Sequence, residues 1–302
     1  MWIQEPGPVT ERIEFLGRPE LCTYLLKGDI YALVGGGMAH IVPDVLGQLE
    51  NLDIDIERIR YLIILHTHYD HLGIAPYLSK YWPWLRVAVS GVGASILKNK
   101  NALKAIQDYN NAFIDKNNGS HGIESLNVVQ EGFPVHHILN ERAEMDLGNK
   151  IKFYMFDSPG HSVCSQALYV PKEYALFPSD SMGVLTEEKI MPVGSSNYDQ
   201  FQNSIEKLSK IGAENICLDH FGALIPPDGK EFFNKAKKSA GEFREKMIYT
   251  YKKTKDIDET VNELSVDFNC GLSEVGLLPE DLMKDILKRM VIFVNKLGQN
   301  LY

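Results

Sequence analysis

The chain has 302 residues and a formal net charge of −9, from 31 basic and 40 acidic side chains. Hydrophobic residues make up 44% and charged residues 24%, a globular composition that argues against disorder. The acidic excess makes a nucleic acid backbone an unfavourable partner, and no apolar run exceeds the five residues of runs such as Tyr61–Leu65 and Met290–Val294, far fewer than the roughly 20 residues of a membrane span. No signal peptide is visible, and no two cysteines form a C-x-x-C pair, so we expect a cytoplasmic protein with reduced thiols: Cys22, Cys164, Cys217 and Cys270.

The first two thirds of the chain alternate strand-like runs with turns and helices. Cys22–Leu26 and Ile30–Val34 are β-prone runs separated by Lys27-Gly28-Asp29, which predicts a hairpin. Tyr61–Leu65 is apolar throughout, as expected of an interior strand with both faces buried. Composition and periodicity predict further helices over Val42–Leu52, most of Gly93–Ile114 and Phe201–Ile211, and further strands over Leu85–Val89, Ile151–Phe156, Ala167–Val170, Ala175–Phe177 and Ile216–Leu218.

The last seventy or so residues have a different character. Apolar residues recur there at spacings of three and four, which is the pattern of amphipathic helices. One stripe consists of Phe232, Ala236, Ala240, Phe243, Met247 and Tyr251, and another of Leu282, Ile286, Met290, Val294 and Leu297. We therefore predict an α/β catalytic domain over residues 1–229 and a C-terminal helical extension over residues 230–302.

Four potential metal ligands lie within six residues directly after the predicted interior strand. The segment reads His66-Thr67-His68-Tyr69-Asp70-His71. Residues two apart point to the same side only in an extended segment, so His66 and His68 can share a metal if the chain leaves the strand in extended form. An isolated buried histidine is usually a hydrogen-bonded core residue, but packing four ionisable groups at a strand end without a cation would be costly. The cluster therefore predicts a metal site.

Three further candidate ligands follow apolar runs downstream, namely His161, Asp180 and His220. Imidazole and carboxylate ligands suit zinc, iron and manganese alike. Seven ligands are too many for one tetrahedral ion and about right for two divalent metal ions per chain. A carboxylate is the natural bridge between two cations, and Asp180 is the best candidate for it.

The order of these motifs resembles that of the metallo-β-lactamase-fold hydrolases. The motifs are His66–His71, Pro159-Gly160-His161-Ser162, Ser179-Asp180 and His220, and the resemblance extends from the first hairpin to about Gly229. It implies the metallo-β-lactamase fold, which is an αβ/βα sandwich of two mixed β-sheets flanked by helices. The C-terminal helical extension is additional to that fold.

The resemblance also implies how the ligands divide between two ions. Carried over by motif, His66, His68 and His161 would hold one ion, and Asp70, His71 and His220 the other, with Asp180 bridging. In one place the chain departs from the family. The family usually has an aspartate after the early hairpin strand, which supports the ligands without binding metal, whereas this chain reads Val34-Gly35-Gly36-Gly37. The departure concerns how the site is oriented, not whether metal is present.

A subgroup of the family resembles the chain in more detail. Tyr69 within the motif, the long helical insertion before His161 and the C-terminal helices look like the quinolone-signal response protein and its relatives. Those are thioesterase-like members in which the added helices roof the active site. The resemblance therefore implies a similar extension that covers the active site here.

The ligand set itself indicates the reaction. Two cations that share a water lower its pKa toward neutrality and create a hydroxide nucleophile, so we expect hydrolysis at a carbonyl or phosphoryl centre, with Asp70 and Asp180 ordering the nucleophile. The motifs contain no separate general acid, which favours a leaving group that departs as an anion. A thiolate, whose thiol has an ordinary pKa of about 8.5, suits this better than an alkoxide. Tyr69 either assists at the substrate oxygen or packs beside the site.

Several alternatives share these features. A lactonase or a phosphodiesterase uses the same ligand set, and a metal-binding regulatory protein with vestigial hydrolase activity is the alternative of a different class. The segment Lys230–Lys255 carries nine basic and three acidic residues, which fits either a helix that receives an anionic substrate tail or a solvated face opposite the apolar stripe. We expect a small-molecule substrate, anionic or acyl-CoA-like, and neither a membrane nor a nucleic acid as partner. A homodimer is a possible assembly.

Overall fold

The computed structural model describes residues 1–116, 123–187, 189–268 and 273–296, so Cys270 and Leu297 lie outside the described residues. The chain forms two compact units. The first comprises Met1–Asp157, Cys164–Ser179 and Ala213–Gly229, and the second comprises Ser158–Val163, Asp180–Gly212 and Lys230–Tyr302. Within the described part of the chain, no helix combines the length and the hydropathy that a bilayer span requires.

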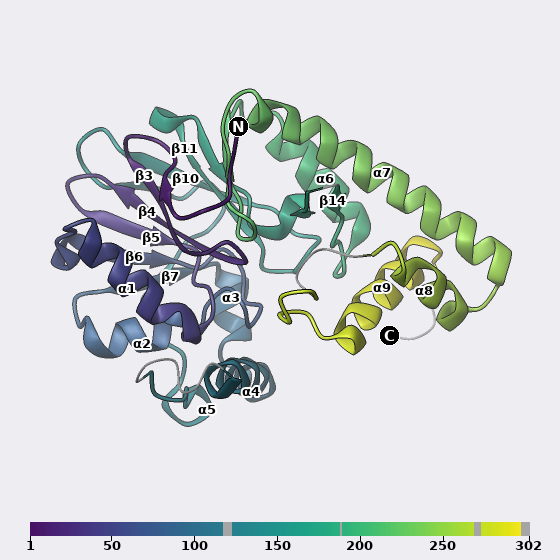
Figure 1. Ribbon diagram of the computed structural model, residues 1–302, viewed down its shortest axis with the longest axis horizontal. Helices are drawn as coiled ribbons and strands as arrows, with labels where there is room; N and C mark the ends of the chain where they lie inside the picture. The colour runs from purple at the N-terminus through teal and green to yellow at the C-terminus, as the bar shows by residue number, and fades with distance from the viewer. Residues whose placement is uncertain (117–122, 188, 269–272, 297–302) are drawn as a thin grey trace. The chain divides into compact units, whose positions relative to one another are not determined.

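Two seven-stranded mixed sheets make up most of the first unit (Figure 1). In one sheet, neighbouring strands are antiparallel from β2 to β5 and parallel from β5 to β8. Its strands, in spatial order, are β2 (Gly7–Pro8), β3 (Ile13–Arg18), β4 (Leu21–Lys27), β5 (Tyr31–Val34), β6 (Ile59–Ile63), β7 (Arg86–Val89) and β8 (His137–Ile138).

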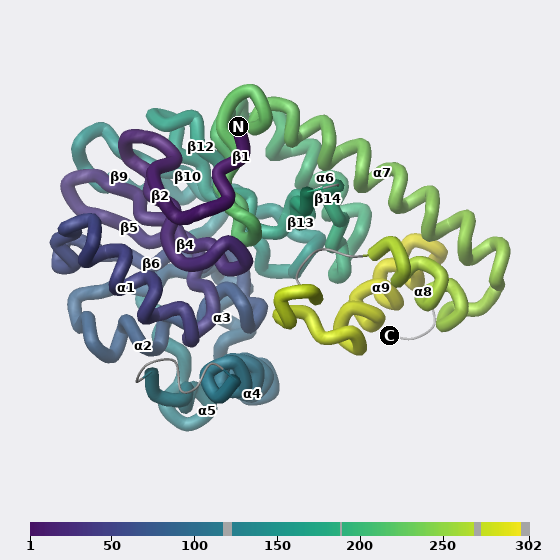
Figure 2. The backbone as a smooth tube through the Cα atoms, viewed as in Figure 1, coloured from purple at the N-terminus to yellow at the C-terminus, as the bar shows by residue number. Residues whose placement is uncertain are grey.

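The second sheet is antiparallel except for one parallel pair, β12 with β15. Figure 2 labels β1, β9, β10 and β12 of this sheet on the backbone tube. Its strands, in spatial order, are β1 (Trp2–Ile3), β16 (Ala223–Leu224), β15 (Asn215–Cys217), β12 (Ala175–Phe177), β11 (Gln166–Val170), β10 (Lys152–Asp157) and β9 (Glu144–Asp146). The helices of this unit are α1 (Val42–Asn51), α2 (Ile74–Tyr81), α3 (Gly91–Ile96), α4 (Lys100–Lys116) and α5 (Val128–Glu131).

Apolar side chains from both sheets form one core. They include Phe15, Tyr24, Ile63, Phe153, Leu168 and Phe177. The ring of Tyr24 on β4 meets that of Phe177 on β12 edge to face, with centroids 5.4 Å apart, which is a favourable arrangement for two aromatic rings. On the outside, α1 packs against β3 and α2 against β7. The predicted αβ/βα sandwich is therefore confirmed.

The predicted interior strand is confirmed as β6, which lies between β5 and β7 and runs parallel to both. The strand ends at Ile63, two residues before the apolar run does. Beyond it, the amide of Ile64 donates to the carbonyl of Ala88 (2.9 Å), and the carbonyl of Leu65 accepts from the amide of Gln166 on β11 (2.9 Å). The chain thus leaves β6 in extended form and reaches the second sheet immediately before His66.

The second unit contains helices α6 (Tyr198–Leu208), α7 (Asp228–Thr254, from Lys230 onward), α8 (Ile257–Ser265) and α9 (Glu280–Val294), and the strand pair β13 (Val184–Leu185) and β14 (Ile190–Met191). On α7 the predicted stripe is buried except for Tyr251, which is half-buried. On α9 the buried residues are Met283, Leu287, Met290, Val291 and Val294. The buried face of α9 is therefore turned slightly from the predicted one, and Leu282 and Ile286 are only half-buried.

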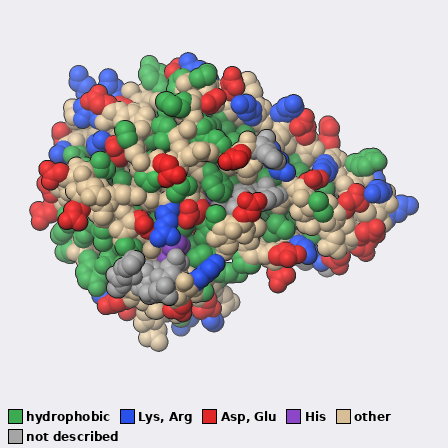
Figure 3. Space-filling model, in the orientation of Figure 1, with side chains coloured by type: hydrophobic (Ala, Val, Ile, Leu, Met, Phe, Trp, Pro, Cys, Tyr) green, Lys and Arg blue, Asp and Glu red, His purple; other side chains and the backbone are tan. Residues whose placement is uncertain are grey.

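The basic residues of α7 are largely neutralised by carboxylates of the same unit. The ion pairs are Lys235–Glu231, Lys237–Glu206, Lys238–Glu242, Arg244–Asp199, Lys246–Asp267 and Lys253–Glu263. Figure 3 shows side chains of both signs interspersed over the region of α7 to α9, without a continuous basic surface on the visible face. These pairs favour the solvated-face interpretation of the basic segment.

We expect a buried histidine of the first unit to make the protein less stable in mild acid. His40 is 4% exposed and stacks on Phe113, with ring centroids 5.3 Å apart. Burial, assisted by the positive charge of Arg18 and opposed by Asp44, lowers the pKa of His40 from 6.5 to about 4. Between these values the unfolded chain binds a proton that the folded chain does not, so stability that is complete above pH 6.5 falls by on the order of 3 kcal/mol toward pH 4.

The check is urea unfolding of the wild type and of His40→Leu at pH 7 and at pH 4.5. The midpoint of the wild type should fall more between the two pH values than that of the variant, because leucine binds no proton. An equal fall in both proteins would contradict this role for His40.

Candidate metal centre

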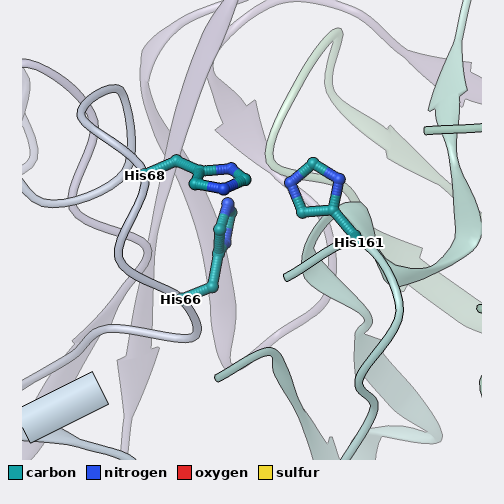
Figure 4. Close-up of side chains that lie close together, drawn as sticks. All are labelled: His66, His68 and His161. Atoms are coloured by element: carbon teal, nitrogen blue, oxygen red, sulfur yellow. The ribbon is translucent and has the colours of Figure 1, made fainter. Parts of the chain in front are cut away.

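His66, His68 and His161 bring imidazole nitrogens together at one point. One ring nitrogen from each lies within 4.8 Å of the other two, and Figure 4 shows the three rings turned toward one another. His66 and His68 lie on the extended segment after β6, and His161 lies on the loop that follows β10. His66 and His161 are buried and His68 is half-buried.

Asp70, His71 and His220 form a second group with ligand atoms within 4.8 Å of one another. Oδ2 of Asp70 is 3.3 Å from Nε2 of His71 and 3.8 Å from Nε2 of His220. His220 belongs to the loop between β15 and β16. The two groups adjoin, because the ring centroids of His66 and His71 are 4.2 Å apart.

Asp180 lies in a short 3-10 helix, Ser179–Met182, that follows β12. Its side chain is buried, and Oδ2 is 3.3 Å from Nε2 of His161. A carboxylate at this distance can bind the same cation as the imidazole beside it. Its bridging between two ions stays a prediction.

The Nδ1 atoms of four histidines each face a hydrogen-bond acceptor. Those of His161 and His220 lie 2.8 and 2.7 Å from the backbone carbonyls of Val193 and Glu20, and both must donate, because a carbonyl only accepts. Nδ1 of His71 lies 3.2 Å from Oδ2 of Asp219.

The same holds for His66. Its Nδ1 is 2.8 Å from Oγ of Ser179, whose single proton is donated to Asp219, so the imidazole is again the donor. In the neutral tautomer with Nδ1 protonated, Nε2 carries the lone pair that binds a metal. Four buried imidazoles held in this tautomer, together with carboxylates, are a donor set that fits divalent cations such as zinc, iron or manganese.

Asp219 is a functional candidate that the sequence analysis missed. It is 4% exposed, and with His66 and His71 it forms a third group of side chains whose ligand atoms lie within 4.8 Å of one another. Its only signal in the sequence is that it precedes His220 at the end of an apolar run. A single carboxylate with no characteristic spacing to the other ligands cannot be distinguished from a capping or surface residue by sequence alone.

Glycines let the metal-binding segment approach the Gly35–Gly37 turn closely. The amides of Gly73 and Ile74 donate to the carbonyls of Gly37 (2.7 Å) and Gly36 (3.0 Å). A Cβ on Gly36 would lie 2.5 Å from the carbonyl oxygen of His71, so a side chain there would displace the loop that carries the ligands. The three glycines after β5 thus position the loop that carries His66 to His71.

Tyr69 contacts α4 through its ring and through its backbone. Its ring stacks on that of Tyr109 from α4, with centroids 4.3 Å apart and an interplanar angle of 18°. Its backbone carbonyl accepts a hydrogen bond from the amide of Asn110, also on α4 (2.8 Å). These contacts support the packing interpretation, and assistance at the substrate oxygen stays a prediction.

Comparisons with known proteins identify the family and the fold. The model of the metallo-beta-lactamase superfamily matches residues 17–220, more than half of the chain. The chain is similar to the structure of a metallo-beta-lactamase family protein from Thermus thermophilus, with 16% identity, a TM-score of 0.65, and coverage of 96% of this chain and 95% of that one. It is also similar to a metallo-beta-lactamase superfamily protein from the archaeon Sulfolobus tokodaii (17% identity, TM-score 0.57, 76% and 86% coverage) and to rubredoxin oxygen:oxidoreductase from Desulfovibrio gigas (16% identity, TM-score 0.55, 82% and 69% coverage). The structures share the fold, and the match to the family model shows that the chain belongs to the metallo-beta-lactamase superfamily.

Proposed function

We propose that the protein is a dinuclear metal-dependent hydrolase whose substrate is a thioester. The observation that carries the proposal is the pair of adjoining ligand groups, each with ligand atoms within 4.8 Å of one another. The hydrogen bonds that hold the imidazoles with Nε2 unprotonated support it independently. Superfamily membership supports hydrolysis in general, whereas the choice of a thioester rests on the chemistry of the leaving group.

The ligand assignment follows the two groups. We assign His66, His68 and His161 to one ion and Asp70, His71 and His220 to the other, with Asp180 shared. When bound, two such cations supply Lewis acidity and lower the pKa of a shared water toward neutrality. In this mechanism Asp70 and Asp180 accept hydrogen bonds from the attacking water and thereby orient it. For Tyr69 two roles stay open, donation to the negative charge that develops on the substrate oxygen and packing beside the site.

The leaving group decides between the substrate classes. The set of ligand residues includes no further group assigned to protonate a leaving oxygen. A thiolate departs without such help, because its thiol has a pKa of about 8.5, far below that of an alcohol. The resemblance to the thioesterase-like subgroup of the quinolone-signal response protein supports the same class. An acyl-CoA-like or other anionic acyl thioester is therefore the proposed substrate.

We also propose that residues 230–302 act as an extension that restricts access to the active site. The resemblance to the subgroup supports this, and so do the buried apolar stripes of α7 and α9, which make these helices a stable element and not a loose tail. The ion pairs of Lys237 with Glu206 and of Arg244 with Asp199 leave the basic face of α7 little excess charge for a substrate tail. Selectivity is accordingly assigned to steric access.

A cytoplasmic location is part of the proposal. The three described cysteines are buried thiols that form no disulfide with one another, as expected in a reducing compartment. Burial raises the pKa of Cys22 and of Cys217, so both remain protonated and unreactive. A homodimer is compatible with this proposal.

The test combines metal content with substrate choice. Purified protein should contain close to two divalent ions per chain by elemental analysis, because seven ligands are too many for one. Protein of known metal content should then hydrolyse a short acyl-CoA at least about tenfold faster in kcat/KM than a lactone or a phosphodiester of similar size.

Each other outcome has a defined meaning. A protein that holds no metal after expression in zinc-, iron- or manganese-supplemented medium would overturn the proposal. If the protein prefers the lactone or the phosphodiester, that class and not the thioester is its substrate. Two bound ions without turnover on any substrate would instead favour the metal-binding regulatory protein.

A further inference from the structure

We infer that Asp219 is a positioning residue that fixes His66 and His71, the histidines that connect the two ligand groups. The inference rests on the proposed dinuclear site, but it concerns a residue outside the seven proposed ligands. In the family, an aspartate after the early hairpin strand supports the metal ligands. This chain has glycine at that position, and we infer that Asp219 supports the ligands instead.

A chain of hydrogen bonds carries the inference. Oδ2 of Asp219 is 3.2 Å from Nδ1 of His71 and accepts a hydrogen bond from Oγ of Ser179 (2.8 Å). The same hydroxyl lies 2.8 Å from Nδ1 of His66. One buried carboxylate therefore reaches a histidine of each ligand group, directly on one side and through Ser179 on the other.

The direction of these bonds gives them a function. Because Asp219 accepts from both neighbours, the proton of each imidazole is held on Nδ1, and Nε2 is left for a metal. A carboxylate hydrogen-bonded to the far nitrogen of a metal-binding imidazole also fixes the ring plane and raises the basicity of the ligand atom. Asp219 acts on the site through His66 and His71.

The backbone around Asp219 is anchored on β4. The hydroxyl of Tyr24 donates to the carbonyl of Leu218 (2.7 Å), and the amide of Cys22 donates to the carbonyl of Asp219 itself (2.9 Å). Tyr24 is fully buried in the core between the sheets. The carboxylate is thus held by the rigid part of the first unit, as a group that positions other side chains must be.

Gly35 shows why the support comes from residue 219. A Cβ built on Gly35 would lie 3.7 Å from Oδ1 of Asp219 and 3.0 Å from the carbonyl oxygen of Cys22. The φ of Gly35 is +82°, a conformation that disfavours any side chain. The space beside residue 35 is therefore taken by the carboxylate of Asp219, which supplies the negative charge from another loop.

The experiment measures metal affinity in Asp219→Asn, with Glu14→Gln as the matched control. Glu14 is also a buried carboxylate of the first unit, but it pairs with Lys27. Zinc affinity is measured by competition with a chromophoric chelator, and the absorption spectrum of the cobalt-substituted protein reports ligand geometry. We expect Asp219→Asn to weaken zinc binding by about 10- to 100-fold and to alter the cobalt spectrum, while Glu14→Gln leaves both unchanged.

A second variant keeps the test decisive if Asp219→Asn does not fold. Ser179→Ala retains a Cβ at a residue with positive φ and removes only the branch to His66, so its zinc affinity should fall in the same direction by a smaller factor. Wild-type affinity and spectrum in a folded Asp219→Asn or in Ser179→Ala would overturn the inference and leave the dinuclear hydrolase intact. Loss of one whole ion in Asp219→Asn, with the other bound normally, would instead make Asp219 a ligand. A wild type that binds no zinc or cobalt would refute the proposed function itself.

Discussion

Replacing Asp180 with alanine is expected to lower kcat by at least about a thousandfold. The carboxylate is buried, and its Oδ2 is 3.3 Å from Nε2 of His161, so it is directed at the ligand atom of that histidine. In the proposed mechanism Asp180 would be a ligand of the cations and would accept a hydrogen bond from the attacking water. Its removal would take away a negative charge that offsets the charge of the cations and would release the water from its orientation. The measurement is thioester turnover on protein whose metal content has been determined for each variant.

Asp199→Ala is the matched control for Asp180→Ala. This variant also removes a carboxylate from the same unit. The side chain of Asp199, however, is 63% exposed and pairs with Arg244 on α7. Its turnover should remain within about twofold of the wild type, because exposed ion pairs contribute little. Unchanged turnover in Asp180→Ala at unchanged metal content would remove Asp180 from the mechanism. Asp180→Asn, which keeps the shape, separates the loss of charge from the loss of packing.

Much of the fold could be predicted because its elements have strong local signals. The hairpin of β4 and β5 was indicated by Lys27-Gly28-Asp29 between two β-prone runs, and α7 by a stripe that repeats over five turns. β3 was missed because Ile13–Arg18 does not alternate. Five of its six residues are buried, including Glu14, so neither face reads as polar. α8 was not separated from its neighbours, although Asp256 caps it and accepts from the amide of Glu259.

Some residues of the candidate site could also be predicted from the sequence, and others could not. His66, His68, Asp70 and His71 are marked by their density within six residues, and the extended chain after β6 explains why the first two point to one side. No sequence pattern of this kind predicts Asp219, because its contacts with His71 and Ser179 depend on how the loop after β15 packs on β4. Contacts between distant loops follow from tertiary packing, which one sequence does not encode in its spacing. The metal-binding role of each of these residues stays a prediction until ions are measured.

Gly160→Ala is expected to destabilise the second unit by about 4 kcal/mol or more. The φ of Gly160 is +130°, and a Cβ there would lie 2.2 Å from the backbone nitrogen and 2.3 Å from the Cα of Phe201 on α6. Phe201 is fully buried, and the carbonyl of Gly160 accepts from the amides of Ser196 and Asn197 just before the helix (3.0 Å each). Neither partner can move without disturbing the start of α6, so the added methyl group must displace backbone. The measurement is the midpoint of thermal and urea unfolding.

Two other glycines of the same unit separate the cost of backbone strain from the cost of steric overlap. Gly212 has a φ of +83° but open space around its Cβ position, so Gly212→Ala should cost only about 1 kcal/mol of backbone strain. Gly241 lies within α7, also with open space, and Gly241→Ala should stabilise the helix by about 0.5–1 kcal/mol. If Gly160→Ala is no more destabilising than Gly212→Ala, residue 160 does not approach α6 as closely as described. If the expected order holds, a glycine is required before His161, because the backbone there packs directly against α6. A side chain at residue 160 would displace this backbone and, with it, the proposed ligand His161.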